Sequence, residues 1–266
     1  MPRQLQHLPR KDTVTTTLDR TIVARAHSSH ALQLPTAAVV GPTLHGEGPH
    51  TGRPVSVVRL GMCNLACIWC DSSYTWDRSR YNLTIEAPDR GVHDICDEVA
   101  SHGTRTTIVT GGEPLIHQGR QPLAELLIGL SAIGDVHLET NGTIPPTDHT
   151  RALVHHFAVS PKVSSSGESR HRRVRVGALR VYADLARSGR AHFQYVVTSG
   201  RDLDEVDEMV AEYRIPAREV WIVPEGSTAD RMVSDDLAYL AQAVLARGYN
   251  LSTRLPVLIW GNRRPI

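Results

Sequence analysis

Three cysteines in one short stretch constrain this chain more than any other feature of its sequence. Three residues separate Cys63 from Cys67 and two separate Cys67 from Cys70, so one loop can turn all three thiolates toward a single point. Three thiolates suit an iron–sulfur cluster that keeps one iron without a protein ligand. The alternatives are a structural disulfide or a zinc knuckle, but zinc needs a fourth ligand at short spacing, and Asn64 and Asp71 are poor candidates. The spacing therefore predicts a four-iron cluster in this loop.

The same spacing resembles that of the radical S-adenosylmethionine (SAM) superfamily. There, the open iron of a 4Fe-4S cluster chelates the amino and carboxylate groups of SAM, so the resemblance implies both cofactors. The fourth cysteine, Cys96, falls with Val92, Ile95 and Val99 at the spacing of one helical face. Because free cysteine behaves as a small apolar residue, we expect Cys96 in the core and not on iron.

Length and charge favour one large cytoplasmic domain. A chain of 266 residues with 41% hydrophobic content can bury a full core, and its formal charge of +1 provides no general attraction for nucleic acid or an anionic membrane. No run of 18 apolar residues is present to span a bilayer, and the amino terminus lacks the apolar core of a signal peptide. The reducing cytoplasm also suits a thiolate-bound cluster. We expect residues 1–35 to form a loose extension and residues 36–266 to form the radical SAM domain.

From residue 55 onward, patterns typical of strands and helices alternate along the chain. Expected strands cover residues 55–60, 106–110, 136–140, 157–159, 192–198 and 220–223. Expected helices include residues 92–99, 123–130, about 148–156, 174–188, 203–213 and about 229–247. Such alternation predicts an α/β fold, a partial or modified (β/α) barrel of about six mainly parallel strands.

Polar motifs follow five of the expected strands. These motifs are Cys63, Thr110–Glu113, Glu139–Asn141, Ser160–Lys162 and Val223–Glu225. Each motif alone is ordinary turn chemistry, but five at successive strand ends are hard to assign to turns. Because ligand groups gather at the carboxyl ends of parallel strands, we expect one site at this edge.

Longer motifs make the resemblance more specific. The segments Gly-Pro-Thr-Leu-His-Gly-Glu-Gly, Thr-Gly-Gly-Glu-Pro, Glu-Thr-Asn-Gly-Thr, Val-Ser-Pro-Lys and Trp-Gly-Asn-Arg-Arg are similar to those of 7-carboxy-7-deazaguanine synthases, across residues 38–266. That family converts 6-carboxy-5,6,7,8-tetrahydropterin to 7-carboxy-7-deazaguanine with loss of ammonia, on the route to queuosine and related deazapurines. The resemblance implies a small pterin substrate, a flavodoxin- or ferredoxin-type electron donor, a homodimer, and a carboxyl-terminal segment that closes over the substrate.

The resemblance also implies roles for individual residues. The cluster falls to Cys63, Cys67 and Cys70, and Mg²⁺, which prefers hard oxygen donors, falls to Ser72. The residues implied around SAM are Trp69, Cys70, Asp71, Gly112, Glu139, Ser160, Pro161, Lys162, Val223, Pro224, Glu225 and Gly226. The residues implied around the pterin are Leu44, His45, Gly46, Glu47, Arg59, Thr110 and Ile266, the chain's own carboxyl end.

Two residues of the substrate set have clear chemistry. Arg59 can hold the substrate carboxylate through a two-pronged, charge-assisted contact, and Glu47 can accept from the N–H groups of the pterin edge. The ordinary alternatives are a strand-end surface charge for Arg59 and a loop-capping hydroxyl for Ser72. The chain also departs from the family, which usually has glutamine at His45, histidine at Pro256 and lysine at Gln194.

Three kinds of function are compatible with these features. The first is the lyase reaction, in which the radical made from SAM takes the hydrogen on C6 of the pterin. The family resemblance implies that the deoxyadenosine formed later returns a hydrogen, so that SAM is not consumed. The second is an activase that places a glycyl radical on a partner protein, or a radical enzyme for a related purine or pterin. The third is a non-catalytic iron–sulfur or zinc module. We expect the first, because Glu47, Arg59 and Thr110 suit a small pterin better than a polypeptide.

Overall fold

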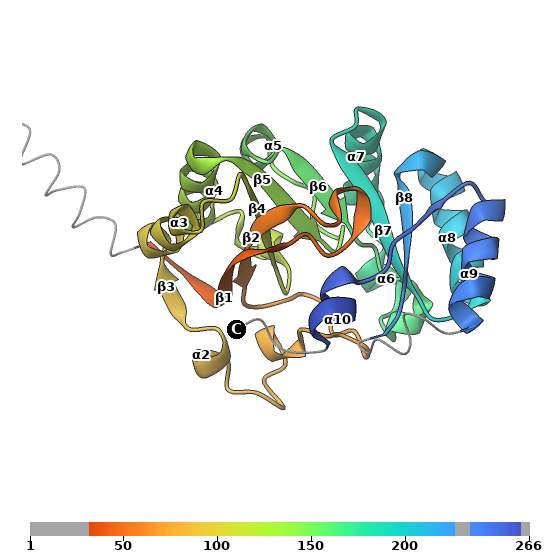
Figure 1. The fold of residues 1–266 in the computed structure, drawn as a ribbon, viewed down its shortest axis with the longest axis horizontal. Helices are drawn as coiled ribbons and strands as arrows, with labels where there is room; N and C mark the ends of the chain where they lie inside the picture. Colours follow the sequence, from red (N-terminus) through yellow and green to blue (C-terminus); the bar gives the residue numbers. More distant parts are fainter. Residues whose placement is uncertain (1–31, 227–234, 262–266) are drawn as a thin grey trace, which may run out of the picture.

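A nine-stranded sheet organises the chain in the computed structural model, which describes residues 32–226 and 235–261. Its strand order is β3-β1-β2-β4-β5-β6-β7-β8-β9 (Figure 1). The strands are β1 (Gln33–Leu44), β2 (Pro54–Leu60), β3 (Asp89–Gly91), β4 (Thr106–Gly111), β5 (Asp135–Thr140), β6 (His156–Val159), β7 (Ala191–Val197), β8 (Val220–Pro224) and β9 (Asn250–Leu251). From β2 through β4 to β9 neighbouring strands are parallel, whereas β1 pairs antiparallel with both β2 and β3.

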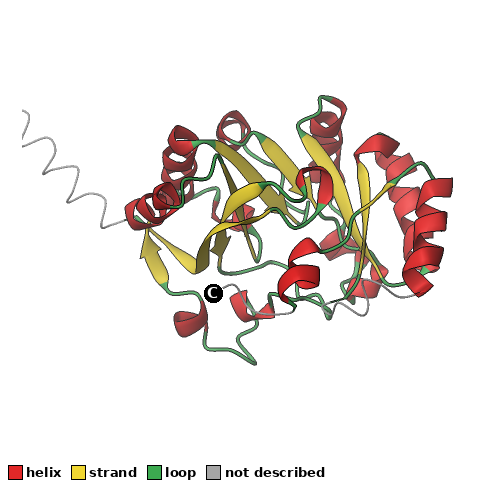
Figure 2. Ribbon diagram, in the orientation of Figure 1, coloured by secondary structure: helices red, strands yellow, loops and turns green. Residues whose placement is uncertain are grey.

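The longer helices lie along the outer side of this curved sheet, as Figure 2 shows. The helices are α2 (Leu83–Glu86), α3 (Val92–Ser101), α4 (Gln121–Ile133), α5 (Asp148–Leu153), α6 (Arg170–Arg173), α7 (Val176–Arg187), α8 (Gly200–Tyr213), α9 (Asp235–Ala246) and α10 (Leu255–Trp260). Single 3-10 turns are η1 (Gly48–His50), η2 (Ser73–Thr75), η3 (Pro114–His117), η4 (Ser164–Ser166) and η5 (Ala217–Glu219). None of the helices in the described part of the chain combines the length and the apolar character needed to cross a bilayer.

The outer face of the sheet carries the apolar core. Alternate strand residues such as Val58, Leu138 and Phe157 are fully buried and belong to one cluster with Leu126 of α4 and Tyr182 of α7. Successive side chains of a strand point to opposite faces, so the residues between these belong to the inner, concave face. The parallel α/β architecture is thus confirmed, as an open sheet with edge strands β3 and β9 within the described residues.

The predicted strands and helices are confirmed with small shifts of their ends, but the sequence patterns missed several elements. The helix expected over 174–188 is observed as α7, which begins at Val176 and ends at Arg187, and the short helix α6 precedes it. The first residues of the helix expected at 229–247 lie outside the described residues, and α9 begins at Asp235. Strand β1 begins at Gln33, inside the expected extension, and it was missed because Pro35 and Pro42 interrupt its pattern. Strands β3 and β9 and helix α10 were also missed because they are short.

The connection from β1 to β2, residues 45–53, folds across the concave face. It contains η1, and Figure 1 shows it curling over β6 and β7. The His50 ring lies 4.8 Å from that of His156 on β6, and Glu47 accepts a hydrogen bond from Gln194 on β7. A segment that follows an antiparallel strand therefore reaches the interior of the partial barrel.

Candidate functional site

The three cysteines lie in a loop that closes on itself directly after β2. The backbone N–H of Met62, next to Cys63, donates to the carbonyl of Thr75 at 2.8 Å. Trp76 directly follows this closing contact, and its indole N–H donates to Sγ of Cys70 at 3.3 Å. The backbone N–H of Leu65 lies 3.5 Å from Sγ of Cys63. Hydrogen-bond donors that point at sulfur stabilise the deprotonated thiolate, and a thiolate is the form of cysteine that binds iron.

The properties of the thiols fit a metal cluster. Cys63, Cys67 and Cys70 are all free of disulfides, and burial raises the pKa of Cys67 and raises that of Cys63 to about 12. Buried thiolates therefore need a cationic partner. Across the described residues no group of three His, Cys, Asp or Glu side chains is arranged to hold a single metal ion.

Cys96 takes no part in this loop. It lies on α3 and packs against α4, where a Cβ placed on Gly129 would come within 2.6 Å of its sulfur. The expectation that Cys96 belongs to the core is therefore confirmed.

Glu113 is fully buried at the start of η3 and joins three motifs. Its Oε1 accepts from the backbone N–H of Leu115 at 3.0 Å, and its Oε2 accepts from the backbone N–H of Asn141 at 2.7 Å. The hydroxyl of Thr140 donates to the same carboxylate at 2.9 Å, and the backbone N–H of Glu113 donates to the carbonyl of Met62 at 2.8 Å. Burial raises the pKa of Glu113 to about 7, although these N–H donors oppose the shift.

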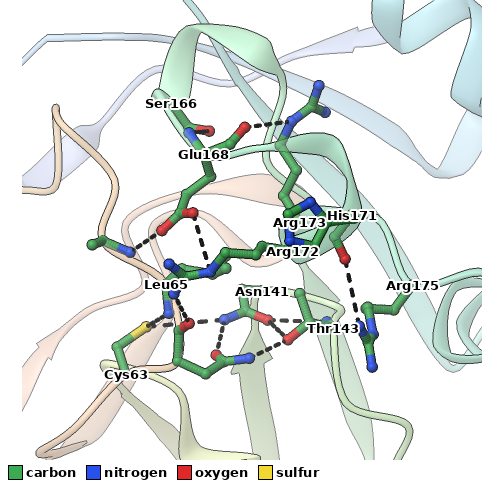
Figure 3. A network of polar contacts seen from close by, with 12 residues as sticks. Cys63, Leu65, Asn141, Thr143, Ser166, Glu168, His171, Arg172, Arg173 and Arg175 are labelled. Atoms are coloured by element: carbon green, nitrogen blue, oxygen red, sulfur yellow. Dashed lines mark hydrogen bonds and ion pairs between the residues drawn. The ribbon is translucent and has the colours of Figure 1, made fainter.

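Two further contacts tie the cysteine loop to the segments after β5 and β6 (Figure 3). Nδ2 of Asn141 donates to Oδ1 of Asn64 at 2.8 Å. Glu168 accepts from the backbone N–H of Ala66 and lies 3.4 Å from the guanidinium of Arg172. Three separate strand ends thus hold the loop in place.

Gly112 is a glycine for a structural reason. A Cβ at this position would lie 2.0 Å from the carbonyl oxygen of Met62 and 2.9 Å from Cβ of Cys63. The missing side chain therefore allows the cysteine loop to rest on the end of β4. Its expected contact with SAM stays a prediction.

The segment after β6 lies against Trp69. The Trp69 indole N–H donates to the carbonyl of Ser165 at 2.9 Å, and Nζ of Lys162 lies 5.5 Å from the Trp69 ring. Lys162 also donates to the hydroxyl of Ser160 at 2.8 Å, and Pro161 stands between them. The expected SAM residues of these two segments are therefore brought together.

Arg254, just before α10, connects the two halves of the expected site. Its Nε lies 2.8 Å from Oε1 of Glu47, and its Nη2 forms an ion pair with Asp71 of the cysteine loop. Its Nη1 donates to the carbonyl of Gly226 at 3.1 Å. Burial raises the pKa of Glu47 despite the Arg254 charge; the pKa of Asp71 is lowered by Arg254 and Arg59, whose charges outweigh burial.

Arg59, Thr110 and Glu139 form a row across the concave face. Arg59 of β2 is paired in register with Thr110 of β4, whose hydroxyl donates to Oε2 of Glu139 at 2.7 Å. Nε of Arg59 is buried and has no hydrogen-bond partner in the described part of the chain. A buried guanidinium nitrogen without a partner needs an explanation, and a bound anion would supply one.

Five histidines fill the concave face on the amino-terminal side of that row, and we call them the histidine layer. The layer consists of His45 and His50 from residues 45–53, and His137, His156 and His192 from β5, β6 and β7. Contacting rings have centroids 4.6–6.0 Å apart, and Nε2 of His156 lies 2.8 Å from Nδ1 of His192. Expected substrate residue His45 thus packs within this layer.

Burial keeps the histidine layer uncharged. It lowers the pKa of His50 and His156 to about 4 and that of His137 to about 3, with further lowering by neighbouring histidines. Four buried ring nitrogens have no partner among the residues that the structure describes. They are Nδ1 of His45, both nitrogens of His50, and Nδ1 of His137.

The remaining expected site residues are placed as follows. Leu44 ends β1 opposite Pro54, and the carbonyl of Gly46 accepts from Leu255 at 3.0 Å. Val223 and Pro224 end β8, followed by Glu225 and Gly226. Ser72 is buried, with its hydroxyl 3.7 Å from Sγ of Cys70. Ile266 lies outside the described residues.

Sequence reasoning missed several residues of the site. Glu113 lies within a motif that was singled out, so its position at a strand end was a usable signal. Arg254 and the histidines of the layer other than His45 had no such signal, because their partners are distant in sequence. Trp76 lies only six residues from Cys70, but no sequence pattern shows that its indole points at that sulfur. Gln194, noted only as a departure, donates to Glu47.

Comparison with known proteins gives matches over most of the chain. The sequence profile of the radical SAM superfamily matches residues 57–213. A 7-carboxy-7-deazaguanine synthase from Pyrobaculum aerophilum is 36% identical over 223 residues, covering 84% of this chain and 93% of its own. Another from Hyperthermus butylicus is 35% identical over 228 residues, covering 82% and 89%. The crystal structure of QueE from Escherichia coli is similar with a TM-score of 0.61 at 25% identity, covering 86% and 97%.

Proposed function

Because this chain belongs to the 7-carboxy-7-deazaguanine synthase family of the radical SAM superfamily, we propose how its own residues perform that family's reaction. The enzyme is a carbon–nitrogen lyase that converts 6-carboxy-5,6,7,8-tetrahydropterin to 7-carboxy-7-deazaguanine with loss of ammonia, in queuosine-type biosynthesis. Its cofactors are a 4Fe-4S cluster and SAM. When bound, they supply the radical that takes hydrogen from C6 of the pterin.

The chain's task is to hold the reactants in place and exclude water, since the difficult chemistry belongs to the cofactors. Cys63, Cys67 and Cys70 hold the cluster. The network around Glu113 fixes the loop from one side, and Trp69 with Lys162 borders the SAM position from the other.

The observation that carries the substrate assignment is the buried Nε of Arg59, which has no hydrogen-bond partner among the residues that the structure describes. A carboxylate placed against it would satisfy this nitrogen and form a charge-assisted hydrogen bond. Thr110 is its neighbour in register, so the pterin carboxylate would lie at the carboxyl end of β2 and β4, beside the cysteine loop.

Arg254 prepares the opposite end of the substrate position. Both carboxylate oxygens of Glu47 already have donors, Arg254 on one and Gln194 on the other. These contacts hold the Glu47 carboxylate in one orientation, in which it would accept hydrogen bonds from N–H groups of the pterin edge. Leu255 and Pro256 pack against Gly46, so the carboxyl-terminal segment covers this loop, as expected for a small and enclosed substrate.

The test is a change of Arg59 to Lys, which keeps the charge but loses the planar fork. We expect kcat/KM for 6-carboxytetrahydropterin to fall about 30- to 150-fold, the equivalent of a lost charge-assisted contact of about 2–3 kcal/mol. Cluster content and SAM binding should stay near wild type. The control is Arg53→Lys, an exposed arginine near the start of the same strand, which should change little.

The same two proteins should be assayed with a pterin analogue that lacks the carboxylate. Wild type should discriminate strongly between the substrates and Arg59→Lys much less. If wild type shows no preference, or the variant keeps the full preference, Arg59 has a structural role and the substrate is not held as proposed. An activase would instead turn over no free pterin.

Three finer features belong to this proposal. The Ser72 hydroxyl, next to Cys70, would bind Mg²⁺ together with substrate oxygens. A flavodoxin- or ferredoxin-type donor would approach the surface hollow that Met62 lines together with Arg78 and Arg80, because Met62 directly precedes Cys63. A homodimer is expected from the family, and size-exclusion chromatography with light scattering tests it.

A further inference from the structure

Trp76 presents an N–H donor to a cysteine of the cluster loop. Its indole nitrogen lies 3.3 Å from Sγ of Cys70. The other groups near these sulfurs lie farther away, with the backbone N–H of Leu65 at 3.5 Å from Cys63 and the hydroxyl of Ser72 at 3.7 Å from Cys70. The indole also has no acceptor lone pair, so it can only donate.

The position of this donor is fixed by the way the loop closes. The backbone N–H of Trp76 donates to the carbonyl of Ser73 at 3.1 Å, so Trp76 caps the carboxyl end of the η2 turn. The preceding Thr75 is fully buried and accepts from Met62 at 2.8 Å. The indole is therefore held against Cys70 by the same contact that brings the two ends of the cluster loop together.

We propose that Trp76 raises the reduction potential of the cluster through its hydrogen bond to the Cys70 thiolate. The inference rests on the proposed function, because it requires a cluster in this loop. One-electron reduction adds negative charge that the thiolates share, and hydrogen bonds to the sulfurs are among the features that set the potentials of such clusters. A donor stabilises the more negative, reduced state more strongly, and its loss makes reduction harder. Trp76 acts through Cys70 and is thus a positioning residue.

The same loop contains a matched comparison. Trp69 lies one residue before Cys70, but its indole N–H donates to the carbonyl of Ser165 at 2.9 Å and not to a sulfur. The two tryptophans offer the same chemical group from the same loop. Only Trp76 directs it at a cluster ligand.

The experiment replaces each tryptophan with phenylalanine and measures the cluster's midpoint potential. Holoenzyme is titrated anaerobically without SAM, and the reduced cluster is followed by electron paramagnetic resonance. We expect Trp76→Phe to shift the midpoint to more negative potential, with the ratio of reduced to oxidised cluster at a fixed potential falling about two- to tenfold. Trp69→Phe should titrate as wild type does.

A second variant guards against a packing effect of the smaller ring. Placing β-(3-benzothienyl)alanine at position 76 keeps the bicyclic shape but replaces N–H with sulfur, and it should give the same negative shift. An unchanged midpoint in this isosteric variant, or an equal shift in Trp69→Phe, overturns the inference while leaving the proposed function intact. Wild-type protein that assembles no cluster would overturn both.

Discussion

Around Glu113, the buried carboxylate accepts hydrogen bonds from three residues, whereas four buried ring nitrogens of the histidine layer have no partner among the described residues. Both regions are polar and belong to one sheet: the Glu113 network lies at the carboxyl ends of β4 and β5, and the histidine layer lies on the concave face. The difference indicates that the carboxyl-end network is a rigid support whose loss leaves donors unsatisfied. The histidine layer, in contrast, consists of neutral side chains whose removal leaves little unsatisfied.

The largest effect should come from the loop that the rigid region supports. Cys67→Ala should abolish both the cluster's brown absorbance and all activity, because two thiolates are too few to hold a cubane. Iron analysis and SAM cleavage after reduction provide the measurement. Cys96→Ala is the control and should keep its iron, with a loss of about 1 kcal/mol in packing. Retention of cluster and cleavage in Cys67→Ala would refute the assignment of the site.

Removing the support itself should have the next largest effect. Glu113→Ala leaves the N–H groups of Leu115 and Asn141 without their acceptor, so we expect a loss of about 3 kcal/mol or more in the free energy of unfolding. Cluster content should fall as well, since Glu113 joins the cysteine loop to β4 and β5. Urea denaturation under anaerobic conditions and iron analysis measure the two effects. Wild-type values for both would mean that the network is dispensable.

Acid should destabilise the histidine layer selectively. In the folded protein the pKa values of His50, His137 and His156 are lowered to about 3–4. In the unfolded chain the same side chains have the ordinary histidine pKa of about 6.5, so below that pH they bind protons in the unfolded chain but not in the folded one. Stability from this source is present above pH 6.5 and is lost as the pH falls toward 4. Between pH 7 and pH 5 the loss should reach at most about 2 kcal/mol for each such histidine.

The measurement is the urea midpoint of holoenzyme at pH 7 and at pH 5. His156→Gln should reduce the difference between the two, whereas His149→Gln, an exposed histidine on α5, should leave it unchanged. If both variants show the full wild-type difference, the layer is not the source of the acid sensitivity.

The smallest effect should come from an apolar replacement within the layer at neutral pH. His137→Leu removes a buried nitrogen that has no partner in the described structure, so the free energy of unfolding should change by less than about 1 kcal/mol in either direction. A loss of 3 kcal/mol, equal to that expected at Glu113, would mean that bound water or another ligand satisfies the layer, and the contrast between the two regions would disappear.

Much of the fold could be predicted because its signals are local. Strand β2, strands β4 through β8 and most helices follow from apolar periodicity, and the cysteine loop follows from spacing within eight residues, from Cys63 to Cys70. β1 is different, because its prolines hide it and it becomes a strand through pairing with both β2 and β3. Pairing of this kind depends on partners that a sequence window does not contain.

By itself, the sequence determined the cysteine loop, the alternation of parallel strands with helices, and the set of motifs at the strands' carboxyl ends, since each depends on residues close together in the chain. Only the tertiary structure decided that Arg254 joins Glu47 to Asp71, and that His45 and His50 contact His137 of β5 and His156 of β6. These contacts arise because the β1–β2 connection crosses the concave face and the carboxyl-terminal segment returns over it. Chain folding over such separations is set by packing of the whole sheet, and no local pattern encodes it.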